Sequence, residues 1–157
     1  MAIGLYGFTE TMRGTWTPLD GSGRKTMWFR CEADAGDALA YLTKGTVTLV
    51  GRLHAEGIAD EAPMTGHMEI RPLSRRIGYD IDFRGADGKR YSFVGQKTLS
   101  LVKLAKTMTT LPGEVLDENG TCIGTARLFF DLRKDLVPFL STFRRARPVL
   151  ALKEAEA

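Results

Sequence analysis

Residues 77–97 read IGYDIDFRGADGKRYSFVGQK, and this stretch decides the fold class. From Ile77 to Arg84, apolar side chains alternate with charged ones, which is typical of a β-strand with one buried and one wet face. The pair Asp87-Gly88 follows, and such a pair supplies the positive φ angles that a tight hairpin turn needs. The alternation then resumes and continues to Lys97. The stretch therefore predicts an antiparallel β-hairpin.

The same period of two recurs along most of the chain. It predicts further strands at 5–16, 25–33, 45–56, 68–71, 113–116 and 122–130. Three segments favour short helices instead: 34–44, 99–106 and about 134–145, of which the last has its apolar residues at helical spacing. We therefore expect a mainly β fold: an antiparallel β-barrel, lipocalin-like or sandwich-like, of about seven to nine strands with two or three short helices, the C-terminal one amphipathic. One domain is expected over 1–150, with a frayed tail at 151–157.

The composition indicates one globular domain and excludes several functional classes. Of the 157 residues, 43% are hydrophobic and 26% are charged, which argues against a disordered chain. The formal net charge of +3 is too small to indicate a nucleic-acid partner. Cys31 and Cys122 lack the spacing of a zinc site or a disulfide framework, and the N-terminus lacks the pattern of a signal peptide. We expect a cytoplasmic protein with no cofactor.

Few residues carry a pattern that points to chemistry. His54 and His67 fall on the polar faces of predicted strands, and no third ligand is spaced to complete a metal site with them. Asp80 and Asp82 share a strand face with arginines, which favours a solvated surface over a catalytic pair. A small enzyme remains the less favoured hypothesis, and it would need Glu10, Asp80 or Asp82 to be buried with a strongly raised pKa.

Four short segments carry a resemblance to a known family. They are Phe8-Thr9-Glu10-Thr11-Met12-Arg13-Gly14, then 77–83, then 87–97, then Thr109-Thr110-Leu111. In this order they resemble bacterial domains attached to GMC-type (glucose-methanol-choline) oxidoreductases of the cholesterol-oxidase kind. The resemblance implies a small β-rich accessory domain associated with lipid or sterol metabolism. It does not imply oxidase activity, because the flavin-binding glycines are absent from this sequence.

Together these observations predict a noncatalytic accessory or binding module that holds a lipid- or sterol-like apolar ligand. The expected ligand-binding residues are inward-facing aromatics and two polar residues at a strand end: Tyr79, Phe83, Tyr91, Phe93, Gln96 and Lys97. Plain core packing is the competing interpretation of the aromatics.

A protein-interaction module is the alternative to a ligand-binding one. It would dock on a separately encoded, lipid-metabolising oxidoreductase of the GMC type. The C-terminal helix offers an apolar and basic surface for such a partner or for peripheral contact with a membrane, through Phe139, Phe143, Arg144 and Arg145. The competing interpretation is a helix packed on the core.

Overall fold

The computed structural model describes residues 5–34, 46–71, 74–98, 110–130 and 144–146. Within these ranges the chain forms nine β-strands and no helix. Their bounds are β1 Leu5–Pro18, β2 Lys25–Asp34, β3 Thr46–Ala55, β4 Ala59–Arg71, β5 Arg76–Arg84, β6 Arg90–Thr98, β7 Thr110–Leu116, β8 Cys122–Phe129 and β9 Arg144–Ala146.

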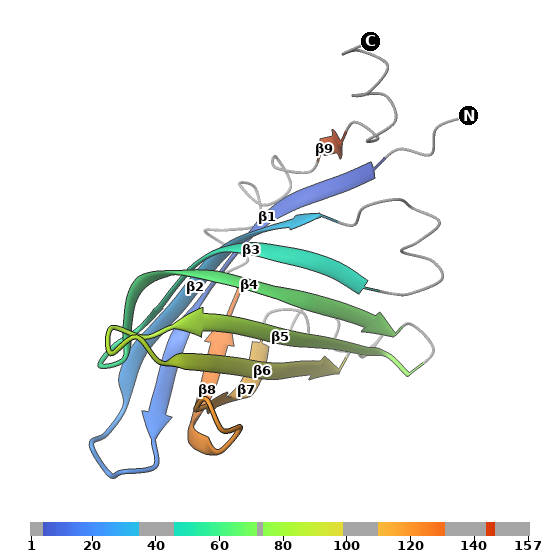
Figure 1. The fold of residues 1–157 in the computed structure, drawn as a ribbon. Helices are drawn as coiled ribbons and strands as arrows, with labels where there is room; N and C mark the ends of the chain where they lie inside the picture. Colours follow the sequence, from blue (N-terminus) through green and yellow to red (C-terminus); the bar gives the residue numbers. More distant parts are fainter. Residues whose placement is uncertain (1–4, 35–45, 72–73, 99–109, 131–143, 147–157) are drawn as a thin grey trace.

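The strands close into an eight-stranded antiparallel barrel (Figure 1). Each strand from β1 to β7 pairs with the next one along the chain, and β8 pairs back onto β1 through Arg13–Pro18. Closure satisfies the backbone hydrogen bonds that the edges of an open sheet would leave unpaired. The predicted antiparallel barrel is confirmed, and so is the hairpin over 77–97.

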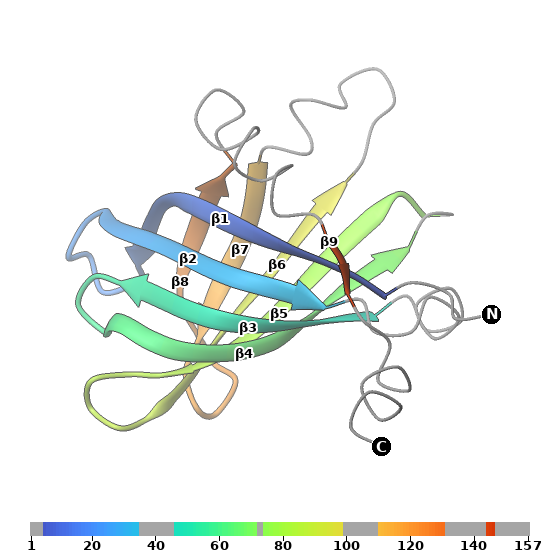
Figure 2. The ribbon, with the colours of Figure 1, turned by 90° about the horizontal axis from the view of Figure 1, so that it is seen from above.

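Four tight turns lie at one end of the barrel, which we call the hairpin end (Figure 2). They span 19–24, 56–58, 85–89 and 117–121. Two of them use the predicted turn glycines, because Gly88 and Gly120 have φ angles of 81° and 78°. We call the opposite end of the barrel the far end; it is the end at which β2, β4, β6 and β8 finish.

The predicted helices are not found among the described residues. Asp34, the expected start of the first helix, is the last residue of β2, and the rest of that helix and the one at 99–106 lie outside the described residues. The prediction of a helix over 134–145 is wrong at its C-terminal end, since Arg144 and Arg145 belong to β9. There they pair with Gly7 and Tyr6 of β1. This part of β1 extends beyond β8 and offers backbone groups that a strand can satisfy.

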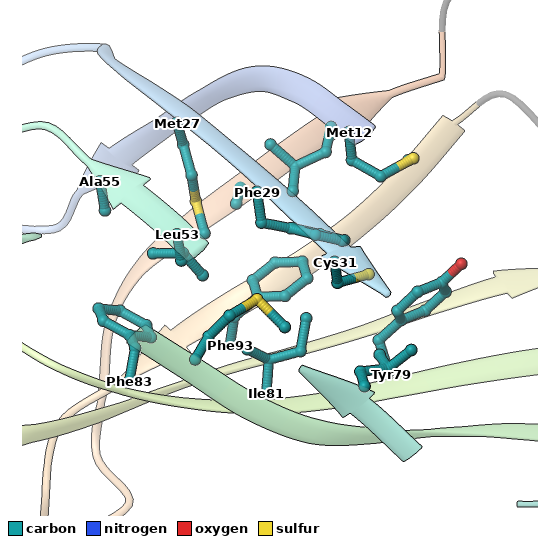
Figure 3. Close-up of a cluster of buried hydrophobic side chains, with 14 of the residues drawn as sticks. Met12, Met27, Phe29, Cys31, Leu53, Ala55, Tyr79, Ile81, Phe83 and Phe93 are labelled. Carbon is teal, nitrogen blue, oxygen red and sulfur yellow. The ribbon is translucent and has the colours of Figure 1, made fainter. Parts of the chain in front are cut away.

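Apolar side chains from opposite walls meet in the middle of the barrel (Figure 3). Phe29 of β2 packs against Phe93 of β6, with ring centroids 6.4 Å apart. It also packs against Tyr79 of β5, at 6.2 Å. Because β2 and β6 are four strands apart in a barrel of eight, these rings span its interior. The interior at this level is therefore filled by side chains.

Three strand glycines allow neighbouring backbones to approach closely: Gly14, Gly51 and Gly66. A Cβ added to Gly51 would overlap the carbonyl oxygen of Arg30 and the Cα of Cys31 on the neighbouring strand, and Gly14 and Gly66 meet neighbouring backbone in the same way. Backbones that approach so closely leave no room for a side chain. The close approach of β1 to β8, of β3 to β2 and of β4 to β5 therefore depends on these glycines.

Gly51→Ala is expected to lower the free energy of unfolding by about 1–3 kcal/mol, because the β2 backbone must move to admit the methyl group. Equilibrium unfolding in urea measures the change. Gly78→Ala is the matched control, since a Cβ at this strand glycine meets nothing within 4 Å. Equal effects of the two substitutions would contradict the close approach of β2 and β3.

Candidate functional site

Two charged side chains and a tyrosine are buried inside the barrel. Residue exposure is 5% for Glu10, 6% for Lys97 and 2% for Tyr79. The strand period places them there, since Glu10 shares the inner face of β1 with Met12, and Lys97 shares the inner face of β6 with Phe93. We call these three residues the buried polar cluster.

The members of the buried polar cluster contact one another across the barrel. The Tyr79 hydroxyl donates to the carboxylate of Glu10, at 3.1 Å from Oε1 and 3.2 Å from Oε2. Lys97 Nζ lies 3.5 Å from Glu10 Oε1 and 5.2 Å from the centroid of the Tyr79 ring. Since β1 and β5 are opposite walls, the hydrogen bond between Glu10 and Tyr79 spans the interior. The arrangement combines an anion, a cation and a hydroxyl in a nonpolar environment.

The environment of the cluster suppresses ionisation of its tyrosine and of the adjacent thiol. Burial raises the pKa of Tyr79 well above its ordinary value, and the negative charge of Glu10 raises it further. Burial and the same charge also raise the pKa of Cys31, which pairs with Glu10 in the β1–β2 register. Tyr79 is thus a hydrogen-bond donor, and Cys31 is a neutral thiol rather than a nucleophilic thiolate.

The buried polar cluster lies toward the far end of the barrel. Tyr79 is near the start of β5 and Lys97 is the penultimate residue of β6, both strand ends remote from the hairpin turn at 85–89. In Figure 3, the Tyr79 hydroxyl points away from the apolar cluster that contains Phe83. The neighbouring inner wall toward the far end is apolar and includes Ala33 and Val47.

The structure divides the six predicted ligand-binding residues among four places. Tyr79 and Lys97 meet in the buried polar cluster, while Phe93 belongs to the packed middle of the barrel. Phe83 and Tyr91 stack at the hairpin end, with ring centroids 5.8 Å apart. The remaining residue, Gln96, is exposed on the outer wall. The six residues therefore do not form one site.

The carboxylates considered for catalysis also differ in position. Glu10 is buried, whereas Asp80 and Asp82 are exposed on the outer face of β5. The hydroxyl of Ser92 donates to Asp82, at 2.7 Å. Of the three acids, only Glu10 has the burial that acid–base chemistry would need.

The two histidines lie on the outer wall. His54 stacks on Trp28 with ring centroids 5.8 Å apart, and its Nδ1 lies 3.1 Å from Asp60 Oδ1. His67 is exposed and pairs in register with Asp80. Among the described residues, no group of three His, Cys, Asp or Glu side chains is placed to hold a metal ion.

The predicted surface at the C-terminus is described only in part. Phe139 and Phe143 lie outside the described residues, while Arg144 and Arg145 form the short strand β9. In the described ranges, no helix is long and apolar enough to cross a membrane.

A hollow of about 1460 Å³ lies along the outer wall and is lined by residues of β1 and of β3 to β8. Its lining mixes both signs of charge and includes His67, Gln96, Glu114 and Arg127. Side chains of opposite sign share this surface, so it does not select one class of charged ligand. The buried polar cluster is the more specific feature.

One feature of the sequence points to this cluster, namely the strand phase of its two charged residues. Glu10 and Lys97 occupy the same strand phase as buried apolar residues, which places them inside if the alternation is taken literally. The usual preference of Glu and Lys for the surface points the other way. Their proximity could not be inferred, because Glu10 and Tyr79 are 69 residues apart.

At the hairpin end, Tyr91 forms a hydrogen bond with the side chain of Asp87. Its hydroxyl donates to Asp87 Oδ2 at 2.7 Å. This bond raises the pKa of Tyr91 to about 12 and lowers that of Asp87. The bond couples the stability of the β5–β6 turn to pH at both extremes.

We expect the free energy of unfolding to fall as the pH rises from 10 to 12. Folded Tyr91 keeps its proton up to about pH 12, whereas an unfolded tyrosine loses it near 10.0, so unfolding releases a proton in this window. Urea unfolding across the window measures the slope, and Tyr91→Phe should reduce it. The stabilisation from Asp87 has the opposite dependence, since it is present above pH 3.8 and declines below it. An unchanged alkaline slope in Tyr91→Phe would contradict this assignment.

Searches against known proteins return no relative. No protein-family model, curated protein or solved structure matches this chain.

Proposed function

We propose that this protein is a noncatalytic binding module for a lipid- or sterol-like ligand. The ligand's polar group would contact the buried polar cluster, and its apolar body would lie against the inner wall at the far end. The observation that carries the proposal is the cluster itself: Glu10, Tyr79 and Lys97, buried together in an otherwise apolar barrel.

Fold stability alone is a poor explanation for this cluster. Transferring a carboxylate and an ammonium out of water costs several kcal/mol per ion, and their attraction often fails to offset that cost. Apolar side chains of similar volume would fill the same space, as they do elsewhere in the barrel. Buried polar groups that converge within a nonpolar site are typical of ligand recognition.

The packed interior restricts where a ligand could bind. Phe29 and Phe93 meet across the middle of the barrel, and Phe83 and Tyr91 stack beyond them at the hairpin end. Of the interior formed by the described residues, the far end is the part from which a ligand would reach Glu10 and Lys97. Small up-and-down barrels of the lipocalin kind hold one small ligand within the barrel, which supports this placement.

The resemblance noted in the sequence supports an accessory role in lipid or sterol metabolism. Three of the segments that carry it each contribute one member of the cluster: Glu10 lies in 8–14, Tyr79 in 77–83 and Lys97 in 87–97. A separately encoded oxidoreductase of the GMC type is accordingly the partner that we propose. The cytoplasm, with peripheral contact at a membrane, is the location that fits such a partner.

Identification of co-purifying molecules tests the proposed function directly. The protein is purified under native conditions and extracted with organic solvent, and the extract is examined by mass spectrometry beside that of a sample denatured and washed before extraction. We expect a lipid or sterol in stoichiometric amount from the native sample only. A native sample without such a molecule, which also fails to bind added sterols and long-chain lipids, would refute the proposal.

Tyr79→Phe is expected to reduce the amount of co-purifying ligand about tenfold, because it removes a hydroxyl and alters the hydrogen bonding of Glu10. The same mass-spectrometric measurement quantifies the loss. Tyr91→Phe is the matched control, since it removes a tyrosine hydroxyl at the hairpin end. Equal retention of ligand by both variants would argue against the cluster as the binding site.

A small acid–base enzyme is a second candidate, favoured by the burial of Glu10. In a bound ketone, the carboxylate would take a proton from the carbon next to the carbonyl and return it, while Lys97 or Tyr79 donates a hydrogen bond to the oxygen. Exchange of that proton for solvent deuterium is measurable by mass spectrometry. Exchange that requires the protein and is lost in Glu10→Gln would support the enzyme, and no exchange would leave the binding module as the function.

A further inference from the structure

We infer that the polar group of the ligand is uncharged, a hydroxyl or a ketone, rather than a carboxylate or an amine. The inference rests on the proposed function and specifies its ligand class. It follows from the balance of charge in the buried polar cluster and from the spacing of its atoms.

The described interior of the barrel carries one buried carboxylate and one buried ammonium. Side-chain exposure is 7% for Glu10 and 6% for Lys97, so both charges are shielded from water. Their sum is zero. A ligand carboxylate would bring a net negative charge into this region and a ligand amine a net positive one, and uncompensated charge is strongly disfavoured away from water. A neutral polar group preserves the balance.

A neutral ligand oxygen has the hydrogen-bonding chemistry that complements an ammonium and a carboxylate lying side by side. Lys97 Nζ and Glu10 Oε1 are 3.5 Å apart, so one such oxygen can contact both groups. A hydroxyl group can accept a hydrogen bond from an ammonium and donate one to a carboxylate at the same time. A ketone can only accept, and it would take the bond from Lys97. Both groups therefore complement this pair.

Four probes that share one alkyl chain test the inference on the unmodified protein. They are dodecanol, 2-dodecanone, dodecanoate and dodecylamine, studied by isothermal titration calorimetry at neutral pH. The neutral probes are kept below their solubility limit and the charged probes below their critical micelle concentration. We expect the alcohol and the ketone to bind about 100-fold more tightly than either charged probe.

The possible results separate the inference from the proposed function. Binding of dodecanoate or dodecylamine as tightly as dodecanol would overturn the inference while leaving a lipid-binding module in place. Failure of all four probes and of sterols to bind would overturn the proposed function, and the inference with it.

Glu10→Gln provides a second test through a change in selectivity. The substitution removes the buried negative charge, so the carboxylate of dodecanoate can replace it opposite Lys97. We expect the affinity for dodecanoate, relative to dodecanol, to rise at least tenfold. Thermal unfolding verifies that the variant is folded. Asp80→Asn makes the same change of charge on the outer face and should leave the selectivity unaltered, and an equal shift in both variants would overturn the inference.

Discussion

Lys97→Met is expected to lower the free energy of unfolding by about 3–5 kcal/mol, because it leaves the Glu10 carboxylate buried without its cation. Both side chains are more than nine-tenths buried, and Nζ lies 3.5 Å from Oε1. The Tyr79 hydroxyl remains as a donor but cannot balance the charge. Equilibrium unfolding in urea, followed by tryptophan fluorescence, measures the loss.

The double variant Glu10→Gln, Lys97→Met is the critical comparison. It removes both charges, so we expect it to be more stable than Lys97→Met alone, even though it contains one more substitution. Lys89→Met, in the exposed β5–β6 turn, controls for the loss of a lysine and should change stability little. A double variant less stable than Lys97→Met would contradict the ion pair.

Phe93→Ala is expected to destabilise the barrel by about 3–5 kcal/mol, since its ring is fully buried and packs against Phe29 from the opposite wall. The cavity that the substitution creates lies where neighbouring side chains cannot easily move inward. The same urea experiment measures the effect. Phe129→Ala is the control, because Phe129 is 44% exposed on β8. A small loss in Phe93→Ala would indicate that the interior is not filled at this level.

The two predictions together separate the two regions of the interior. Loss of Phe93 should affect stability throughout, because its ring links opposite walls in the middle of the barrel. Substitutions that remove one of the two charges of the buried polar cluster should affect both stability and ligand content. A variant that retains its stability but loses its ligand, as we expect for Tyr79→Phe relative to Tyr91→Phe, identifies the binding role of the cluster.

Local features of the fold could be predicted because short-range physics determines them. The alternation over 77–97 predicts which residues face inward, and Tyr79, Phe83, Tyr91 and Phe93 are all buried. The Asp87-Gly88 turn lies where a positive φ is required. In the same way, the alternation over 45–56 places Val47, Leu49, Leu53 and Ala55 inside. A period of two is a property of one strand and needs no partner to be recognised.

The short C-terminal strand β9 could not be predicted from the local sequence pattern. Apolar spacing favours a helix up to Arg145, yet Arg144 and Arg145 lie in β9. Their backbone pairs with Gly7 and Tyr6, more than a hundred residues earlier in the chain. A segment of three residues takes its conformation from such a partner rather than from its own propensity.

The sequence by itself indicated a strand in each of β1 to β8, the turns at Asp87-Gly88 and Asn119-Gly120, and the inward faces of β3, β5 and β6, because these depend on neighbouring residues. Only the tertiary structure decided that the barrel closes through β1 and β8, and that closure brings Glu10, Tyr79 and Lys97 together from three strands. The register between distant strands fixes which inward residues meet. It depends on the simultaneous pairing of all eight strands, which no single segment encodes.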